Sequence, residues 1–160
     1  MKKILFISLA LVGSFCSSQD YSSYDKINKE NDLTINGIVV SGLSIQQVVN
    51  NFGEPDKIED FFFEMENDNG YIYLYNDGLK LFIRNEFGLE SFEIFGKNYL
   101  VTINQLKVGD SIERLKTIFP KSYNIGKYKG AISVMFNDAD YYLAFMSKNQ
   151  KITDINLYKF

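Results

Sequence analysis

The chain of 160 residues contains no histidine and no tryptophan, only two prolines, and a single cysteine, Cys16. Without histidine there can be no Ser-His-Asp or Cys-His nucleophile system, no imidazole acid or base, and no histidine-ligated metal. One cysteine cannot form an internal disulfide, so stability must come from a hydrophobic core. Phosphate-binding loops and nucleophile-elbow motifs are also missing. The sequence therefore predicts that the protein is not an enzyme and has no catalytic residues, no metal site and no cofactor.

Hydrophobic residues make up 46% of the chain and aromatic residues 16%, with 14 Phe and 11 Tyr. This length and apolar content are typical of one globular domain or of two very small ones. The formal net charge is −3, and the sequence shows no basic stripe. Net acidity of this kind argues against nucleic acid as a partner and against anionic membrane surfaces.

The N-terminus has the pattern of a secretory signal peptide. Two lysines precede an apolar run, residues 4–15, which is shorter than the roughly 20 residues of a membrane-spanning helix. Small residues before Gln19 predict cleavage there, which makes residues 1–18 the signal peptide and leaves no integral membrane segment in the mature chain. Lipidation of Cys16 is the less favoured alternative, because the bulky Phe15 stands where a lipobox has a small residue. We therefore predict that the protein is exported and is either periplasmic or secreted. A lipid-anchored protein is the less favoured alternative.

The rest of the chain divides into a lead-in and an internal repeat. Residues 19–32 are polar and lack a period, which predicts a flexible N-terminal segment. Beyond them, residues 35–55 resemble residues 103–120. The predicted units are a first repeat over residues 33–98 and a second over residues 99–160.

Each repeat is predicted to begin with a short amphipathic helix. Ser44 followed by Gln47 forms a capping-box pattern, and apolar residues then recur at helical spacing as far as Phe52. Phe119 takes the matching place in the second copy, where Pro120 is expected to end the helix. Helices of roughly two to three turns are not stable alone, so each needs a sheet to lie on.

Paired strands are predicted to follow each helix. Apolar runs on either side of Asn76-Asp77-Gly78 are typical of a β-hairpin. The predicted strands are residues 71–75, 79–83 and 89–95 in the first copy and residues 131–136, 140–145 and 152–158 in the second. The sequence therefore predicts an α+β fold: two tandem helix-plus-antiparallel-meander units form one extended sheet, with short helices on one face.

A resemblance to a known group of proteins rests on residues 108–120, which read Val-Gly-Asp-Ser-Ile-Glu-Arg-Leu-Lys-Thr-Ile-Phe-Pro, and on the looser residues 41–55. These segments resemble the helix motif of the β-lactamase-inhibitor-protein-like family and of the SmpA/OmlA lipoprotein of outer-membrane assembly. The resemblance covers residues 33–158 and implies protein binding rather than catalysis, the inhibitor holding its target on a concave, aromatic-rich sheet. This chain lacks the inhibitor's disulfides and a clean lipobox, so neither specific activity carries over.

The candidate partner-binding residues lie in the first hairpin. If Asp77-Gly78 forms a two-residue turn, Tyr71 and Tyr73 share an outward face with Phe82 and Arg84, the composition of a binding hot spot. If the turn has three residues, the leucines of the second strand move to the tyrosine face. The second copy has Ile132, Val134 and Phe136 at the places that match Tyr71, Tyr73 and Tyr75, which favours burial of the tyrosines.

The acidic segment, residues 54–68, is interpreted as a solvated strand and turn, with a docking surface for a basic partner or a calcium site as alternatives. Taken together, the sequence predicts an exported, non-enzymatic protein-binding module of an inhibitor or immunity type, which binds another exported protein through a sheet face. The alternative is an envelope-associated structural or assembly accessory, a lipoprotein if Cys16 is lipidated.

Overall fold

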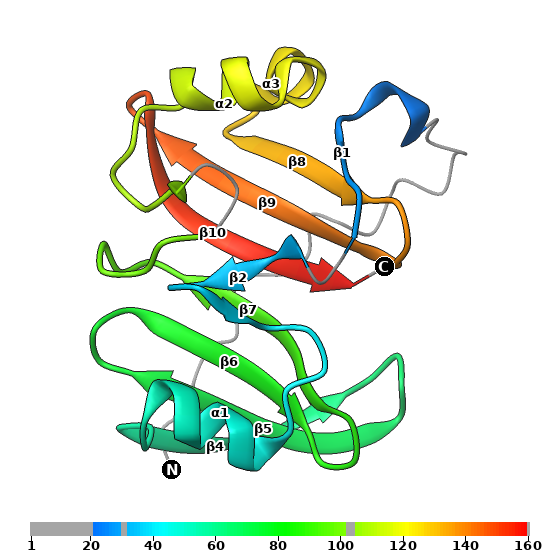
Figure 1. The fold of residues 1–160 in the computed structure, drawn as a ribbon, viewed down its shortest axis with the longest axis vertical. Coiled ribbons are helices and arrows are strands. Elements are labelled where there is room, and N and C mark those ends of the chain that lie inside the picture. The colour runs from blue at the N-terminus through cyan, green and yellow to red at the C-terminus, as the bar shows by residue number, and fades with distance from the viewer. Residues whose placement is uncertain (1–20, 30–31, 102–104, 160) are drawn as a thin grey trace, which may run out of the picture.

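The computed structural model describes residues 21–29, 32–101 and 105–159, and these residues form one large sheet with a few short helices on it (Figure 1). The strands are β1 (Lys26–Ile27), β2 (Thr34–Ile35), β3 (Ile38–Val39), β4 (Lys57–Phe63), β5 (Asp68–Tyr75), β6 (Leu79–Arg84), β7 (Gly88–Ile94), β8 (Ala131–Phe136), β9 (Tyr141–Lys148) and β10 (Lys151–Lys159). Eight of them make the sheet, and β2 and β3 form a separate ribbon. The predicted α+β class and the single extended sheet are confirmed.

The strand order of the sheet is β1-β8-β9-β10-β7-β6-β5-β4. Successive strands β4 to β7, and likewise β8 and β9, pair antiparallel. The short strand β1 pairs parallel with β8. The two halves of the sheet meet where β10 pairs antiparallel with β7, with Ile155 opposite Ile94. The last strands of the two meanders are therefore neighbours at the centre of the sheet, and β4 lies at one edge.

The helices are α1 (Ile45–Phe52), α2 (Glu113–Ile118) and α3 (Pro120–Gly126), preceded by a 3-10 turn, η1 (Tyr21–Ser23). The predicted capping box is present at α1, since Ser44 Oγ accepts from the Gln47 backbone and Gln47 Oε1 accepts from the Ser44 N–H. Pro120 ends α2 as expected, but it also opens α3, which was not predicted. Proline is well suited to the first position of a helix because its missing N–H would have no intrahelical partner there.

One face of the sheet carries the hydrophobic core. Figure 1 shows α1 in front of the strands at one end of the sheet, α2 and α3 beside β8 at the other, and the β2–β3 ribbon between them. These elements bury Val48, Leu115, Tyr123 and Ile35 in a single cluster. The sheet contributes Leu81, Phe92, Val134, Phe145 and Ile155, among others, to the same cluster. Burial of this apolar surface is what holds such short helices in place.

The N-terminal part of the chain differs from the prediction for residues 19–32. The segment was expected to lack regular structure, yet Lys26–Ile27 forms β1, and Ile27 is buried in the core. The Asp25 carboxylate accepts from the Ser122 backbone, and the Asp25 N–H donates to Ser122 Oγ, so pairing with α3 holds the segment. These partners lie almost a hundred residues away, where no local pattern reveals them.

Residues 1–18 and Cys16 lie outside the described residues, so signal-peptide cleavage, export and lipidation stay predictions. Along the ranges that the structure describes, no helix is both long enough and apolar enough to span a membrane. The acidic segment 54–68 folds as β4 and the turn that leads into β5, as its interpretation as a strand and turn predicted.

Candidate binding face of the sheet

The register of the β5–β6 hairpin decides which side chains face the core. Tyr75 pairs with Leu79, so the turn has three residues, Asn76 to Gly78, and Gly78 takes the left-handed φ of 101° that such turns require. Tyr73 consequently pairs with Leu81 and shares its face. The two-residue register, in which Tyr73 would pair with Phe82, is wrong, and the three-residue alternative is correct.

The four candidate partner-binding residues are therefore divided between the two faces. Tyr73 is 7% exposed within the core, and Tyr71 packs against it from a partly buried position. Burial raises the pKa of Tyr73, with a further contribution from Glu54. Phe82 and Arg84 point to the opposite face, since Phe82 pairs with Ile72 and Arg84 with Gly70. The predicted patch is not one surface, because a shift of one residue in register sends every side chain of a strand to the other face.

The face opposite the core is itself rich in apolar side chains. Following the register from β4 to β8, its apolar members are Phe61, Phe63, Ile72, Leu74, Phe82, Met135, Tyr142, Ala144, Met146 and Tyr158, with Phe95 just beyond β7. The same face also carries the charged residues Lys57, Glu59, Lys80, Arg84, Glu93 and Asp154, and Phe63, Met135 and Ala144 are buried among their neighbours. None of these belongs to the core cluster. No helix among the described residues packs on them, so we call this surface the open face.

Aromatic rings on the open face pack against one another. Phe61 makes edge-to-face contacts with Phe63, at 4.9 Å between ring centroids, and with Phe82, at 5.5 Å. A Cβ added at Gly70 would lie 2.7 Å from the Phe63 ring, so the glycine makes room for that ring to lie over β5. Across the sheet, Tyr142 and Tyr158 stack with centroids 5.2 Å apart. The rings hold each other in fixed positions, which lowers the entropy cost of using them in binding.

A polar group sits among these apolar side chains. Asn156, on the central strand β10, is only 6% exposed, and its Nδ2 donates to Tyr158 Oη at 2.9 Å. Its Oδ1 atom has no hydrogen-bond partner among the described residues. A buried acceptor without a partner costs free energy, and a donor supplied by a binding partner would remove that cost.

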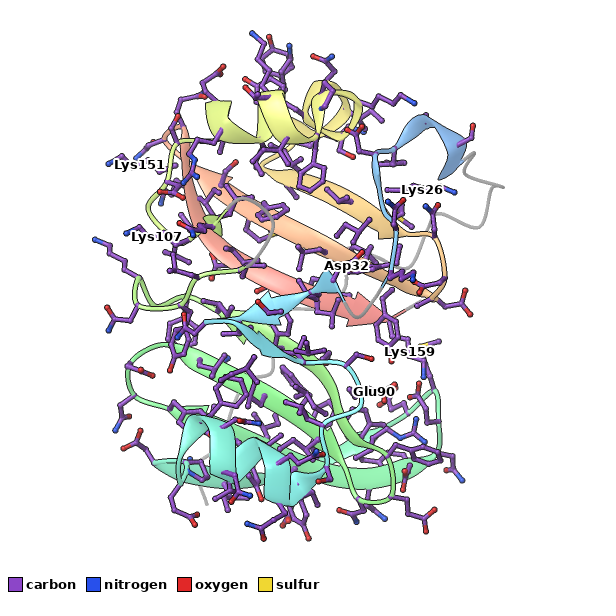
Figure 2. All side chains as sticks on the ribbon, viewed as in Figure 1. Lys26, Asp32, Glu90, Lys107, Lys151 and Lys159 are labelled. Atoms are coloured by element: carbon purple, nitrogen blue, oxygen red, sulfur yellow. The ribbon has the colours of Figure 1, made fainter. Side chains whose placement is uncertain are left out.

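Arg84 belongs to a network of charges at one end of the sheet. Its guanidinium lies 3.1 Å from Asp68 and 3.7 Å from Glu90, and the network continues from Glu90 to Lys159 at 2.7 Å and from Lys159 to Glu66 at 3.1 Å. Figure 2 shows Glu90 and Lys159 pointing toward each other. The hydrogen bond to Glu90 is the main cause that raises the pKa of Lys159, against the effect of partial burial. These pairs tie β10 to the β4–β5 hairpin, a structural role.

The described residues thus form an α+β protein in which helices cover one face of the sheet and none of the described helices packs on the other. No protein-family model matches the chain, and no curated protein matches it in sequence. Among solved structures, a DUF4309 family protein, YjgB from Bacillus subtilis, is similar over 88% of this chain and 90% of its own, with 15% identity and a TM-score of 0.42. A TM-score this low does not establish a shared fold.

Proposed function

We propose that this chain is an exported, non-enzymatic protein-binding module that holds another exported protein against its open face. The observation that carries the proposal is the set of packed aromatic and aliphatic side chains on a sheet surface on which no described helix packs. An antiparallel sheet with one solvated face normally alternates apolar and polar residues, yet β5 presents Ile72 and Leu74 on one side and tyrosines on the other. Large contiguous apolar patches on soluble proteins mark interaction sites.

The mechanism that we propose is steric occlusion. The packed rings of the first half and the Tyr142–Tyr158 stack would serve as rigid anchors, and Asn156 Oδ1 would accept one hydrogen bond from the partner. An aromatic surface around a single buried acceptor favours a partner that matches it in shape and supplies a donor at that point. Such a surface suits an inhibitor or an immunity-type protein, which acts by covering its target.

We also propose that the chain is built from two related units, residues 33–98 and 99–160. The chain order in each half supports this, because helix precedes meander both times, and the two closing strands, β7 and β10, are neighbours. Tyr73 and its predicted counterpart Val134 both lie in the core. Pairing of the two closing strands would join the halves into one extended binding surface.

The experiment is capture of the partner from the exported fraction of the source cells by the immobilised mature chain. The test variant is Ile72→Ala/Phe82→Ala, which removes a cross-strand pair from the open face. The matched control is Tyr128→Ala, which removes a ring that is 90% exposed but lies in the turn after α3. We expect wild type and control to retain one partner in a fixed ratio and the double variant to lose it by at least about tenfold.

Equal capture by the double variant would refute the open face as the binding surface, as would the absence of any stoichiometric partner. Melting curves of all three proteins separate lost binding from lost folding. The envelope-accessory alternative depends on lipidation of Cys16, so the intact mass of the protein from its source decides between a start at Gln19 and an acylated cysteine.

A further inference from the structure

A cleft of about 550 Å³ lies at the end of the sheet away from Glu90 and Lys159, and four lysines line it. Lys97 follows β7, Lys107 lies in the loop before α2, and the other two are the last residue of β9 and the first of β10, Lys148 and Lys151. Figure 2 shows Lys107 and Lys151 at the edge of the molecule opposite Lys159. Three separate chain segments thus bring their ammonium groups to one concave surface.

These four lysines have no ion-pair partner in the part of the chain that the structure describes. None of the ion pairs formed among the described residues includes the four lysines. The one carboxylate that lines the cleft, Asp110, is paired with Arg114 and accepts from the Lys107 backbone. Of the other cations of the sheet, Lys57, Lys80, Arg84 and Lys159 have acidic partners, whereas Lys26 is in no ion pair among the described residues.

The cleft also contains two local features that are unfavourable by themselves. Lys148 and Lys151 are direct cross-strand partners, and like charges in that position repel. The two residues that join them, Asn149 and Gln150, both have left-handed φ, 53° and 62°, a conformation that usually calls for glycine at the second position. The tight turn holds the two lysines opposite each other, and strained backbone of this kind is concentrated at functional sites.

The two halves of the chain differ strongly in charge, and three of the four cleft lysines belong to the basic half. Residues 33–98 contain eleven acidic and four basic side chains, a net of −7, whereas residues 99–160 contain five acidic and nine basic, a net of +4. The chain-wide charge of −3 conceals this division. A local positive field of this sort attracts an anionic partner and speeds its encounter.

We propose that the cleft binds an acidic segment of a protein partner, whose carboxylates neutralise the four lysines. The inference rests on the proposed function in taking the ligand to be part of a protein, and it adds a second contact site outside the open face. The lining favours carboxylates on a flexible chain over phosphate, because it contains no arginine, whose planar fork suits bidentate phosphate binding. Lysine ammonium groups act as point charges and accept carboxylates in many orientations.

The test is binding of a fluorescent ten-residue glutamate peptide to the mature chain, followed by anisotropy at about 20 mM and 150 mM salt. The cleft variant is Lys107→Gln/Lys151→Gln. The control is Lys26→Gln/Lys121→Gln, which changes the net charge equally at two exposed lysines outside the cleft. We expect at least a fivefold weaker affinity for the cleft variant, less than a twofold change for the control, and weaker binding at the higher salt.

Equal weakening in both double variants would overturn the inference, because it would show attraction to net charge rather than to the cleft. Absence of peptide binding by the wild type would overturn it too. So would a competition experiment in which pyrophosphate displaces the labelled peptide at a lower concentration than the unlabelled glutamate peptide does. The open-face variant Ile72→Ala/Phe82→Ala should bind the peptide normally. If the wild type binds the peptide but captures no partner, the proposed function is refuted. If the wild type captures a partner but does not bind the peptide, only the cleft is refuted.

Discussion

The two faces of the sheet differ in composition and in surroundings: the covered face is almost entirely apolar, whereas the open face mixes aromatic and aliphatic side chains with charged ones. On the covered face, the helices and the β2–β3 ribbon exclude water from side chains such as Phe92 and Phe145, which have no exposure. On the open face, the described contacts of rings such as Phe82 and Tyr158 are with neighbouring rings of the sheet. The comparison teaches that apolar residues on a strand identify the strand but not its buried side.

The largest expected effect contrasts two phenylalanines on adjacent strands. Phe92 is fully buried, so Phe92→Ala should lower the free energy of unfolding by about 3–5 kcal/mol through lost burial and a cavity. Phe82 is partly exposed on the other face, and Phe82→Ala should cost roughly 1 kcal/mol. Urea denaturation measures both. Similar losses at the two positions would show that the open face is buried in the isolated protein.

A smaller effect is expected from the charge network at the edge of the open face. Arg84→Met removes the partner of Asp68 and Glu90, whose side chains are 26% and 10% exposed, and should cost about 2–3 kcal/mol. The matched control is Lys57→Met, since its pair with Glu59 is exposed and should contribute less than about 0.5 kcal/mol. If urea denaturation gives Arg84→Met the same free energy of unfolding as the wild type, the network does not stabilise the fold. Arg84 would then again be a candidate binding residue.

The smallest expected effect is a loss of stability at alkaline pH, caused by a buried tyrosine on the covered face. Burial raises the pKa of Tyr75 to about 12, with smaller contributions from Tyr73 and nearby carboxylates, and its hydroxyl donates to the Gly53 carbonyl at 3.1 Å. Because the phenol ionises more readily in the unfolded chain, stability should hold below pH 10 and decline toward pH 12. Tyr75→Phe should make this decline shallower, as followed by melting temperature between pH 8 and pH 12.

The control for that measurement is Tyr128→Phe, which removes a hydroxyl from an exposed ring. Its alkaline decline should match that of the wild type. If Tyr75→Phe also matches the wild type, the Tyr75 hydroxyl is not excluded from water, and the core would be looser on that side of α1.

Local patterns were sufficient for most of the elements. All six predicted strands are present, and Ser44 with Gln47 caps α1 as the spacing indicated. These features depend on residues within one turn of each other, so the sequence shows them directly. The sequence pattern predicts the end of a helix at Pro120 but not the helix α3 that begins there. Proline is compatible both with the end of one helix and with the first position of the next.

The candidate site was harder to predict, for a reason that the first hairpin illustrates. Asn76-Asp77-Gly78 is compatible with a turn of two or three residues, and the choice places Phe82 either beside Tyr73 or behind it. The burial of Tyr73 was signalled by its alignment with Val134, which lies in the core as well. The lysine cleft also had a signal, the opposite charges of the two halves, which the whole-chain charge concealed.

By itself, the sequence determined most of the strands and helices, that the core forms without an internal disulfide, and that histidine chemistry is impossible. Only the tertiary structure decided the hairpin register, the pairing of β10 with β7, and the gathering of Lys97 with Lys148 and Lys151. The physical reason is the range of the interactions. Capping, turns and amphipathic spacing act between neighbours in the chain, whereas faces and clefts arise when distant strands exclude water together.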